Sequence, residues 1–351
     1  MQTINTSNPL LFSGKKADFL LAASVTHTCD INNITQAGIP GKIHLTPTLD
    51  AEFITTAKVF SLEGIAETPK GVPTPALITR AVEQLCPFSC IKTLDLGLEV
   101  TPQNCDILEF DISPSQSIST PKTGAAIDAQ TLFNKGLEAG RDYQAQGEYI
   151  ILGESTPAGT TTALASIVCL GYDELKEAFS SSFADAPYSL KAIVLDQANR
   201  NVLVEMNTIE RLSLIADNML LFCAGFVLEA SQHTPIVLAG GTQMAAVLLI
   251  ADNLAAEQDI EFYPENIHLA TTSWVRNDVD SDVVQILENL SFEITSYFAD
   301  FTFSESTHPA LKLYDEGEAK EGVGAGAALC YALSNGITEE QIIQEVEKFL
   351  V

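Results

Sequence analysis

Basic residues are scarce in this sequence: 18 lysines and arginines stand against 46 aspartates and glutamates, which gives a formal net charge of −28 at pH 7. The shortage argues against nucleic acid or a membrane as a partner, because no basic surface could neutralise an anionic one. A small phosphorylated ligand is not excluded. The backbone N–H groups of a loop or a helix N-terminus can bind one phosphate locally.

Long apolar runs are also missing. The first residues lack a basic segment followed by an apolar core, so we expect no signal peptide. The most apolar later run, LSLIADNMLLFCAGFVLEA, is interrupted by Asp217 and Asn218, which favours a buried helix over a membrane span. We therefore expect a cytoplasmic protein.

Patterns typical of metal ligands are absent as well. Seven cysteines are an odd number spread over a long chain, which indicates reduced thiols rather than a disulfide framework. Cys86 and Cys90 form a lone C-x3-C with no second pair, and the five histidines form neither H-x3-H nor H-E-x-x-H. The sequence predicts no metal site.

What the chain does contain is typical of a globular α/β protein. Apolar residues make up 46% of its 351 residues and charged residues 18%, so it can bury a large core. Short apolar stretches alternate with helical patterns, which predicts a mostly parallel sheet covered by helices on both faces, with ligands at the carboxyl ends of its strands. The predicted strands fall within 19–26, 91–100, 148–152, 235–239, 267–273 and 292–301. The predicted helices fall within 128–146, 208–231, 280–290, 323–334 and 338–350, and two more start near 160 and 242.

The first of three glycine-rich junctions is EYIILGESTPAGTTTALA, a strand followed by a loop and a helix start. A P-loop needs G-x4-G-K-[ST], whereas five residues separate Gly153 from Gly159 here and Thr160 stands in place of lysine. An ATPase or kinase is therefore excluded. Backbone N–H groups, the hydroxyls of Thr160, Thr161 and Thr162, and a helix N-terminus suit one phosphate monoester. A turn before a capped helix explains the stretch equally well.

The second junction, PIVLAGGTQM, takes a buried strand through Gly240 and Gly241 into a helix that starts near Thr242. Two glycines permit the backbone to approach a ligand closely, although tight packing of strand on helix is the structural alternative. Two such junctions in one sheet favour a shared phosphate pocket.

The third junction is KEGVGAGAAL. Gly322, Gly324 and Ala327 satisfy the dinucleotide fingerprint G-x-G-x-x-G/A, but the residues before it form a poor strand and no second strand follows. NAD binding is therefore not predicted. Glu321 stands immediately before this helix start, either as a functional acid or as a surface charge that favours the helix dipole.

In this order and spacing, GE-x4-G-TTTA, AGGTQM and EGVGAGAAL, together with TPTLDAE and PTPALITRA, resemble a known family. The chain is similar over nearly its whole length to the nicotinate-nucleotide:dimethylbenzimidazole phosphoribosyltransferases of cobalamin nucleotide-loop assembly. It most resembles the uncharacterised archaeal and cyanobacterial branch of that superfamily.

The resemblance implies transfer of the 5-phosphoribosyl group from nicotinate mononucleotide to a lower-ligand base, without a metal or other cofactor. It also implies a Rossmann-like sheet and a homodimer. We expect residues 1–315 to form the phosphoribosyltransferase-like α/β domain. Residues 316–351 are expected to form a C-terminal helical element that carries the glycine-rich loop of Glu321 and packs on the same domain.

By motif match, Glu321 corresponds to the catalytic base of the family and Glu154 to the acid of its G-E loop, which would stabilise a ribosyl cation or orient the ribose. The glycines and threonines of the three junctions would hold the phosphate and ribose: Gly153, Gly159, Thr160, Thr161, Thr162, Gly240, Gly241, Thr242, Gly322 and Gly324. The chain departs from the family in GESTPAGTT, where bacterial enzymes have GEMGIGNTT, and in Gln243, where they commonly have glutamate.

Two alternatives stay open at this point. One is a non-catalytic nucleotide- or phosphate-binding protein on the same fold, and the other is a glycosyltransferase of different specificity. The acceptor is open too: dimethylbenzimidazole, adenine or another purine, or a phenol.

Overall fold

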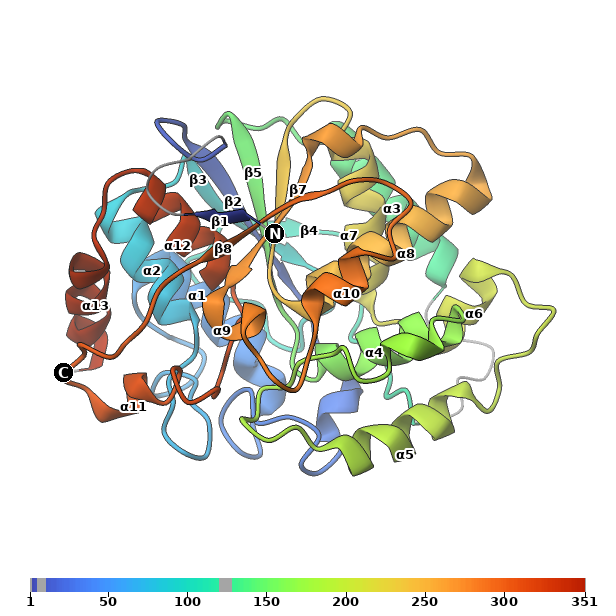
Figure 1. Cartoon of the computed structure of the whole chain (residues 1–351), viewed down its shortest axis with the longest axis horizontal. Helices are drawn as coiled ribbons and strands as arrows, with labels where there is room; N and C mark the ends of the chain where they lie inside the picture. The colour runs from blue at the N-terminus through green and yellow to red at the C-terminus, as the bar shows by residue number, and fades with distance from the viewer. Residues whose placement is uncertain (1, 5–10, 120–127, 351) are drawn as a thin grey trace.

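The computed structural model describes residues 2–4, 11–119 and 128–350. Its centre is one eight-stranded sheet (Figure 1), in which every pairing between neighbouring strands is parallel. In spatial order the strands are β1 (Gln2–Ile4), β8 (Thr295–Ala299), β7 (Ile267–Thr272), β6 (Ile236–Ala239), β5 (Tyr149–Ser155), β2 (Ala17–Ala23), β3 (Cys90–Asp95) and β4 (Ile107–Glu109). The predicted α/β class with a parallel sheet is confirmed.

The sheet has a hydrophobic core on each face. Successive side chains of a strand point to opposite faces, and all residues of the central strands β2, β5 and β6 are buried. In β5, Ile150 and Leu152 belong to one apolar cluster, while Tyr149 and Ile151 belong to the other. Strands covered on both faces are therefore nearly continuous apolar runs in the sequence.

Helices cover both faces (Figure 1). The first cluster includes residues of α3 (Ala129–Asp142), α4 (Gly159–Cys169), α5 (Tyr188–Asn199), α6 (Thr208–Ile215), α7 (Asn218–Ala230), α8 (Thr242–Gln258), α9 (Ser273–Arg276) and α10 (Val283–Leu287). The second cluster includes residues of α1 (Thr46–Thr56), α2 (Ala76–Leu85), α11 (Pro309–Lys312), α12 (Ala325–Ser334) and α13 (Glu339–Glu347). Short 3₁₀ turns span His27–Asp30, Ile43–Leu45, Asp173–Leu175, Pro264–Asn266 and Lys348–Leu350. Within the described ranges, no helix combines the length and apolarity that crossing a bilayer would require.

The prediction of a single helix over 208–231 is wrong. The chain leaves the helical conformation at Ala216 and Asp217, where α6 ends and α7 begins. Asp217 is the N-cap of α7 and accepts a hydrogen bond from Leu220 N (2.9 Å). Aspartate is among the residues preferred at this position, because its carboxylate satisfies a backbone N–H that the helix leaves unpaired.

The predicted strand 148–152 is too short at its carboxyl end. β5 continues through Gly153 and Glu154 to Ser155, because these three residues pair with Leu21, Ala22 and Ala23 of β2. Gly153 and Glu154 are therefore strand residues rather than loop residues. This places the Glu154 side chain on a central, rigid element of the sheet.

The order of the strands creates a switch point between β2 and β5. From β2 the chain proceeds outward to β3 and β4, whereas from β5 it proceeds in the opposite direction to β6, β7 and β8. Ligands of open parallel sheets bind in the crevice at the carboxyl ends of the strands at such a point.

The C-terminal helices pack on the sheet rather than apart from it. Helix α12 contacts β6, β7, β8 and α2, and α13 also packs against α2. Close approach requires glycine at 326, because a Cβ there would lie 2.2 Å from the carbonyl carbon of Thr271 in β7. We infer that residues 316–350 belong to the same domain as the described residues before them.

Candidate active site

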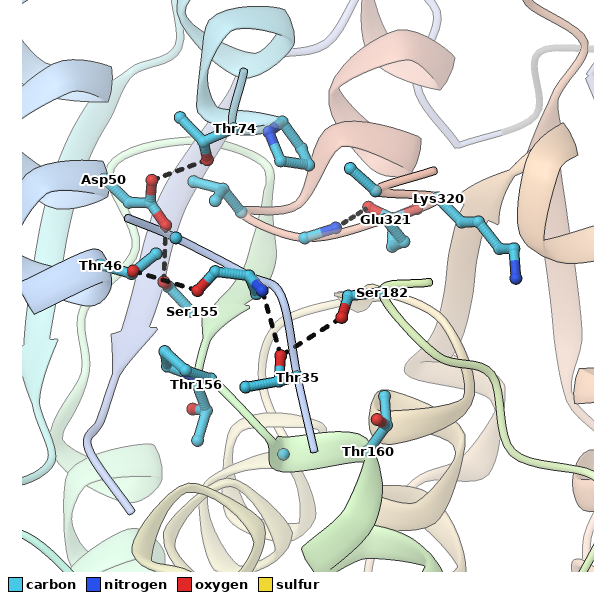
Figure 2. A pocket seen from close by; sticks show the side chains of 18 of the residues that line it. Thr35, Thr46, Asp50, Thr74, Ser155, Thr156, Thr160, Ser182, Lys320 and Glu321 are labelled. Atoms are coloured by element: carbon cyan, nitrogen blue, oxygen red, sulfur yellow. Dashed lines mark hydrogen bonds between the residues drawn. The ribbon is translucent and has the colours of Figure 1, made fainter. Parts of the chain in front are cut away.

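A pocket opens at the carboxyl ends of β5 and β6, next to the switch point. The pocket has an empty volume of about 900 Å³, including the part that is open to solvent. Figure 2 shows side chains converging on it from elements that are far apart in the sequence. The walls come from segments within 35–38, 46–50, 66–75, 154–160, 180–182, 241–243 and 319–323.

Glu154 is one acid of this pocket, and it is buried with an exposed fraction of 8%. Its Oε2 accepts a hydrogen bond from Thr156 N (3.1 Å), which is the one donor that reaches it among the described residues. Burial raises the pKa of Glu154 to about 8, and the nearby charge of Glu321 acts in the same direction. Near neutral pH this side chain is therefore protonated in a large share of molecules.

Glu321 is the second acid, held half-buried between β7 and the start of α12. Its Oε1 accepts hydrogen bonds from Gly322 N (3.2 Å) and Gly326 N (3.1 Å), and its Oε2 accepts them from Thr272 N (3.0 Å) and the Thr271 hydroxyl (3.3 Å). Burial raises the pKa of Glu321 to about 7, and these four donors oppose the rise because they stabilise the ionised form.

The two predicted acids therefore meet in one pocket, although 166 residues separate them in the sequence. Their surroundings differ, since Glu321 has four donors and Glu154 has one. Two like charges in one buried site cannot both ionise freely. Close to neutral pH, the negative charge resides mainly on Glu321.

The first junction reaches the pocket only in part. Gly159 and Thr160, at the start of α4, line it. The structure does not bring Gly153, Thr161 or Thr162 to the pocket surface. Gly153 faces Phe19 and Gly324 instead, and the Thr162 hydroxyl donates to the carboxylate of Asp217.

The second junction contributes Gly241 and Thr242, which line the pocket at the start of α8. Gly240 does not line it and lies against Met244. The Thr242 hydroxyl oxygen accepts a hydrogen bond from Ser180 N (3.1 Å) and lies 3.0 Å from the Ser180 hydroxyl. Two helices of eleven and seventeen residues thus begin at this pocket, and their N-termini favour an anion there.

In the third junction, Gly322 lines the pocket while Gly324 does not. Gly324 has a φ of 70° and caps α12, and a Cβ at this position would lie 2.8 Å from the ring of Phe19. Packing against the sheet therefore accounts for this glycine. No strand leads directly into the junction in the described chain, in agreement with the prediction that the residues before it form a poor strand.

Three residues of the pocket wall have a strained backbone. Ala158, Ala319 and Val323 line the pocket and have φ values of 65°, 48° and 53°. This left-handed region is uncommon for residues other than glycine and is most unfavourable for β-branched ones. Hydrogen bonds from Val323 N to Glu154 O (2.8 Å) and from the Thr79 hydroxyl to Val323 O (2.7 Å) hold Val323 in place. Strain of this kind is typical of functional sites.

Sequence reasoning missed several residues that line the pocket. Asp50 belongs to α1 and accepts hydrogen bonds from the hydroxyls of Thr74 and Ser155, both at 2.7 Å (Figure 2). The stretch TPTLDAE contains Asp50, and PTPALITRA contains Thr74. Neither stretch is a motif whose chemistry identifies a site. The contact between Asp50 and Ser155 arises only in the fold.

A run of serines at 180–182 is a second missed feature of the pocket wall. Two buried lysines lie near these serines, and one of them, Lys320, itself lines the pocket. Lys191 Nζ donates to Ser180 O (2.8 Å), while Lys320 Nζ forms an ion pair with Asp278 (3.0 Å) and donates to Phe183 O (3.2 Å). Burial lowers the pKa of Lys191 to about 8, and the charge of Lys320 adds to this effect.

Two buried donors at the pocket have no partner among the described residues: the Thr156 hydroxyl and the Gln243 side-chain amide. Both residues are less than 8% exposed. A buried polar group without a hydrogen bond costs free energy. Such a group at a pocket is a candidate contact for a ligand.

Known proteins resemble this chain in sequence and in fold. No protein-family model matches it. It is 35% identical over 344 residues to a UPF0284 protein from Archaeoglobus fulgidus, covering 97% of this chain and 95% of the relative. It is 33% identical over 331 residues to one from Sulfurisphaera tokodaii (94% and 92% covered) and 32% identical over 344 residues to one from Gloeobacter violaceus (96% and 89% covered).

Two crystal structures from Thermus thermophilus share the fold. One is a nicotinate-nucleotide-dimethylbenzimidazole phosphoribosyltransferase, with a TM-score of 0.59, 16% identity and coverage of 96% of this chain and 84% of the other. The other is described as CobT, with a TM-score of 0.60, 16% identity and coverage of 95% and 84%. The predicted resemblance is confirmed, in sequence by the UPF0284 relatives and in fold by the phosphoribosyltransferase. With more than 90% of its length matched at over 30% identity, this chain belongs to the UPF0284 family.

Proposed function

We propose that the protein transfers the 5-phosphoribosyl group of nicotinate mononucleotide to an aromatic lower-ligand base in cobamide nucleotide-loop assembly. The observation that carries the proposal is the meeting of Glu154 and Glu321 in one pocket, beside the N-termini of α4 and α8. The shared fold with a phosphoribosyltransferase supports it.

The chemistry proceeds by exchange of one C–N bond for another. A ring nitrogen of the acceptor attacks the ribose C1′ with its lone pair. The bond from C1′ to the nicotinate nitrogen breaks, and its electron pair neutralises the positively charged pyridine ring. The acceptor, now cationic, gives its N–H proton to a carboxylate. No metal or other cofactor takes part.

Glu321 is the proposed acceptor of that proton. It is the acid that is mainly ionised near neutral pH, and its longest hydrogen bond, from the Thr271 hydroxyl at 3.3 Å, can yield to the substrate N–H. Glu154 would lie near C1′, where a negative or strongly polar oxygen stabilises the developing ribosyl cation.

The phosphate would lie between the starts of α4 and α8. Thr160, Thr242 and the 180–182 serines provide hydroxyls there. Lys191 carries a buried positive charge behind the serines, which compensates a phosphate locally in a protein of net charge −28. The unpaired donors of Thr156 and Gln243 are further candidates for contacts with the ligand.

As the resemblance implies, we propose that the enzyme acts as a homodimer, and that it does so in the cytoplasm. Sedimentation velocity of the purified protein measures the oligomeric state directly. A species of twice the chain mass is expected, and a single monomeric species at micromolar concentration would contradict it.

The test of function is incubation with nicotinate mononucleotide and a panel of bases, with mass spectrometry of released nicotinate and of the new riboside phosphate. Glu321→Gln should reduce turnover by roughly a thousandfold or more, because the proton acceptor is lost. Calorimetric binding of nicotinate mononucleotide should change less than about threefold. Glu316→Gln, an exposed acid five residues earlier, is the matched control and should have wild-type activity.

Each failure has a distinct meaning. Nicotinate mononucleotide that binds to the wild type but is never cleaved would favour the non-catalytic nucleotide-binding protein. Near-normal turnover by Glu321→Gln would refute the role of Glu321 while leaving the transfer reaction intact.

A further inference from the structure

Besides Glu154 and Glu321 the pocket is lined by Glu67, which is exposed, and by Asp50, a buried acid that the proposed reaction does not use. Its side chain is 1% exposed and lines the pocket from α1. Oδ1 accepts the Thr74 hydroxyl and Oδ2 accepts the Ser155 hydroxyl. No basic side chain pairs with it among the described residues.

Holding two hydroxyls together does not require a carboxylate. An asparagine could bridge Thr74 and Ser155 without the cost of a buried charge. That cost is visible here, because burial raises the pKa of Asp50 to about 6 even though both hydroxyls act in the opposite direction. A carboxylate differs from an amide in being an acceptor only, and each of its oxygens keeps capacity for a further donor.

The two sides of the pocket differ in character. Hydroxyls gather at the starts of α4 and α8, the side that suits a phosphate. On the side of Asp50 the wall includes five apolar residues, Ala66, Val72, Pro73, Pro75 and Val323, which stand among the polar residues Glu67, Thr68 and Thr74. A planar aromatic base requires an apolar wall with a few placed polar groups.

Asp50 and Glu321 lie at two ends of this apolar wall. Asp50 is bonded to Thr74, and the next residue, Pro75, packs beside Gly322, which follows Glu321. In Figure 2 the two acids approach the pocket from different elements, with Thr74 on the side of Asp50. A flat ring against the wall would present one edge to Glu321 and another edge to Asp50.

We propose that Asp50 recognises the acceptor base by accepting a hydrogen bond from an N–H donor. This donor lies on the edge of the ring away from the nitrogen that attacks C1′. The acceptor class is therefore an amino-substituted purine such as adenine, rather than a methylated benzimidazole. This rests on the proposed function and narrows its acceptor.

The selectivity follows from the cost of leaving the remaining acceptor sites of a buried carboxylate without a partner. An exocyclic amino group forms a charge-assisted hydrogen bond with Asp50. A C–H or methyl edge would cover the carboxylate and leave the remaining acceptor capacity of its oxygens without water or a further donor. Sites built around a substrate N–H reject analogues that lack it more strongly than apolar pockets reject a missing methyl.

The experiment compares kcat/KM for adenine, unsubstituted purine and dimethylbenzimidazole as acceptors with nicotinate mononucleotide. Purine is the matched probe, since it differs from adenine by the amino group alone. The wild type should prefer adenine over purine by roughly 10- to 100-fold, the range of one hydrogen bond to a charged group. Asp50→Asn should reduce this ratio at least about fivefold, while Asp300→Asn, an exposed aspartate, should leave it unchanged.

Two results would overturn the proposal. One is a wild type that does not prefer adenine over purine. The other is an Asp50→Asn variant that loses activity equally with every acceptor and keeps the wild-type ratio, which would mean that Asp50 only positions Thr74 and Ser155.

If no base causes release of nicotinate, the proposed function itself has failed. In that case, the affinities of the wild type and of Asp50→Asn for adenine and purine, measured by calorimetry, test whether Asp50 recognises the amino group. Equal affinity of the wild type for both bases would then refute the proposal.

Discussion

At the scale of single residues, the contrast between Glu154 and Glu321 determines what the pocket can do. Both acids are shielded from water, but four donors surround Glu321 and one reaches Glu154. Separating the pKa values of two neighbouring acids gives each a different protonation state and therefore a different role.

The pH dependence of the reaction follows from this contrast. A proton acceptor is active when ionised, and the ionised fraction of Glu321 increases as the pH passes its pKa of about 7. We therefore expect kcat/KM to rise roughly tenfold per pH unit below 7 and to level off above about pH 8. Initial rates between pH 5.5 and 9 measure this. A flat profile, or one that falls as the pH rises, would contradict it.

The residues of the site could be predicted to differing degrees. Glu154, Glu321, Thr160 and Thr242 all line the pocket, and each stands in or beside a glycine-rich junction that leads into a helix and has a recognisable pattern. Asp50 could not be identified in the same way. Its importance depends on contacts with Thr74 and Ser155, and no periodicity of the sequence encodes such long-range contacts.

At the scale of elements, the break between α6 and α7 shows how one polar residue stops a helix. The apolar pattern continues across 212–230, and such a pattern predicts one helix. Asp217 ends it by capping α7, and the same carboxylate accepts the hydroxyl of Thr162 in α4. The threonine predicted to bind phosphate thus serves to join two helices.

Removal of this carboxylate should destabilise the protein. Asp217→Ala removes the cap of α7 and one of the two acceptors of the buried Thr162 hydroxyl, the other being the Gly159 carbonyl, so we expect the free energy of unfolding to fall by roughly 2 kcal/mol. Asp217→Asn retains a residue that caps helices well and should cost about 1 kcal/mol or less. Urea unfolding gives both values, and equal losses in the two variants would argue against the capping role.

Helix α1 shows why some elements escape prediction. Its sequence, TPTLDAEFITT, contains four threonines and a proline, which are poor helix formers, and it has no polar face. It forms a helix because nine of its residues are buried between the sheet and its neighbours, so tertiary packing overrides the local preference. The strands were easier to predict, because a strand in a sheet that is covered on both faces is apolar along its whole length.

At the scale of the whole molecule, the charge of −28 opposes the compact state. Like charges on the surface repel, and salt screens this repulsion over about 10 Å at 0.1 M ionic strength. We expect the melting temperature to rise by about 5 °C between roughly 20 and 500 mM NaCl. Differential scanning calorimetry measures the shift. KCl at equal ionic strength should produce the same rise, and a fall with added salt would refute the role of repulsion.

The α/β class follows from the alternation of apolar and helical patterns, but the order of the strands does not. Nothing in the sequence of β5 shows that it pairs with β2 rather than with β3 or β4, the strands that directly precede it. The switch point, and with it the place of the pocket, is therefore a property of the assembled sheet.

The distribution of the pocket wall along the chain has a consequence for the time at which activity arises during synthesis. Asp50 and Glu321 stand about 270 residues apart. A ribosome that adds about 5 to 20 residues per second needs roughly 15 to 55 s to make this stretch. The nascent chain can pair β2 with β5 long before Glu321, the proposed proton acceptor, has been synthesised. Substrate thus cannot guide the early steps of folding, and only a nearly finished chain can begin turnover.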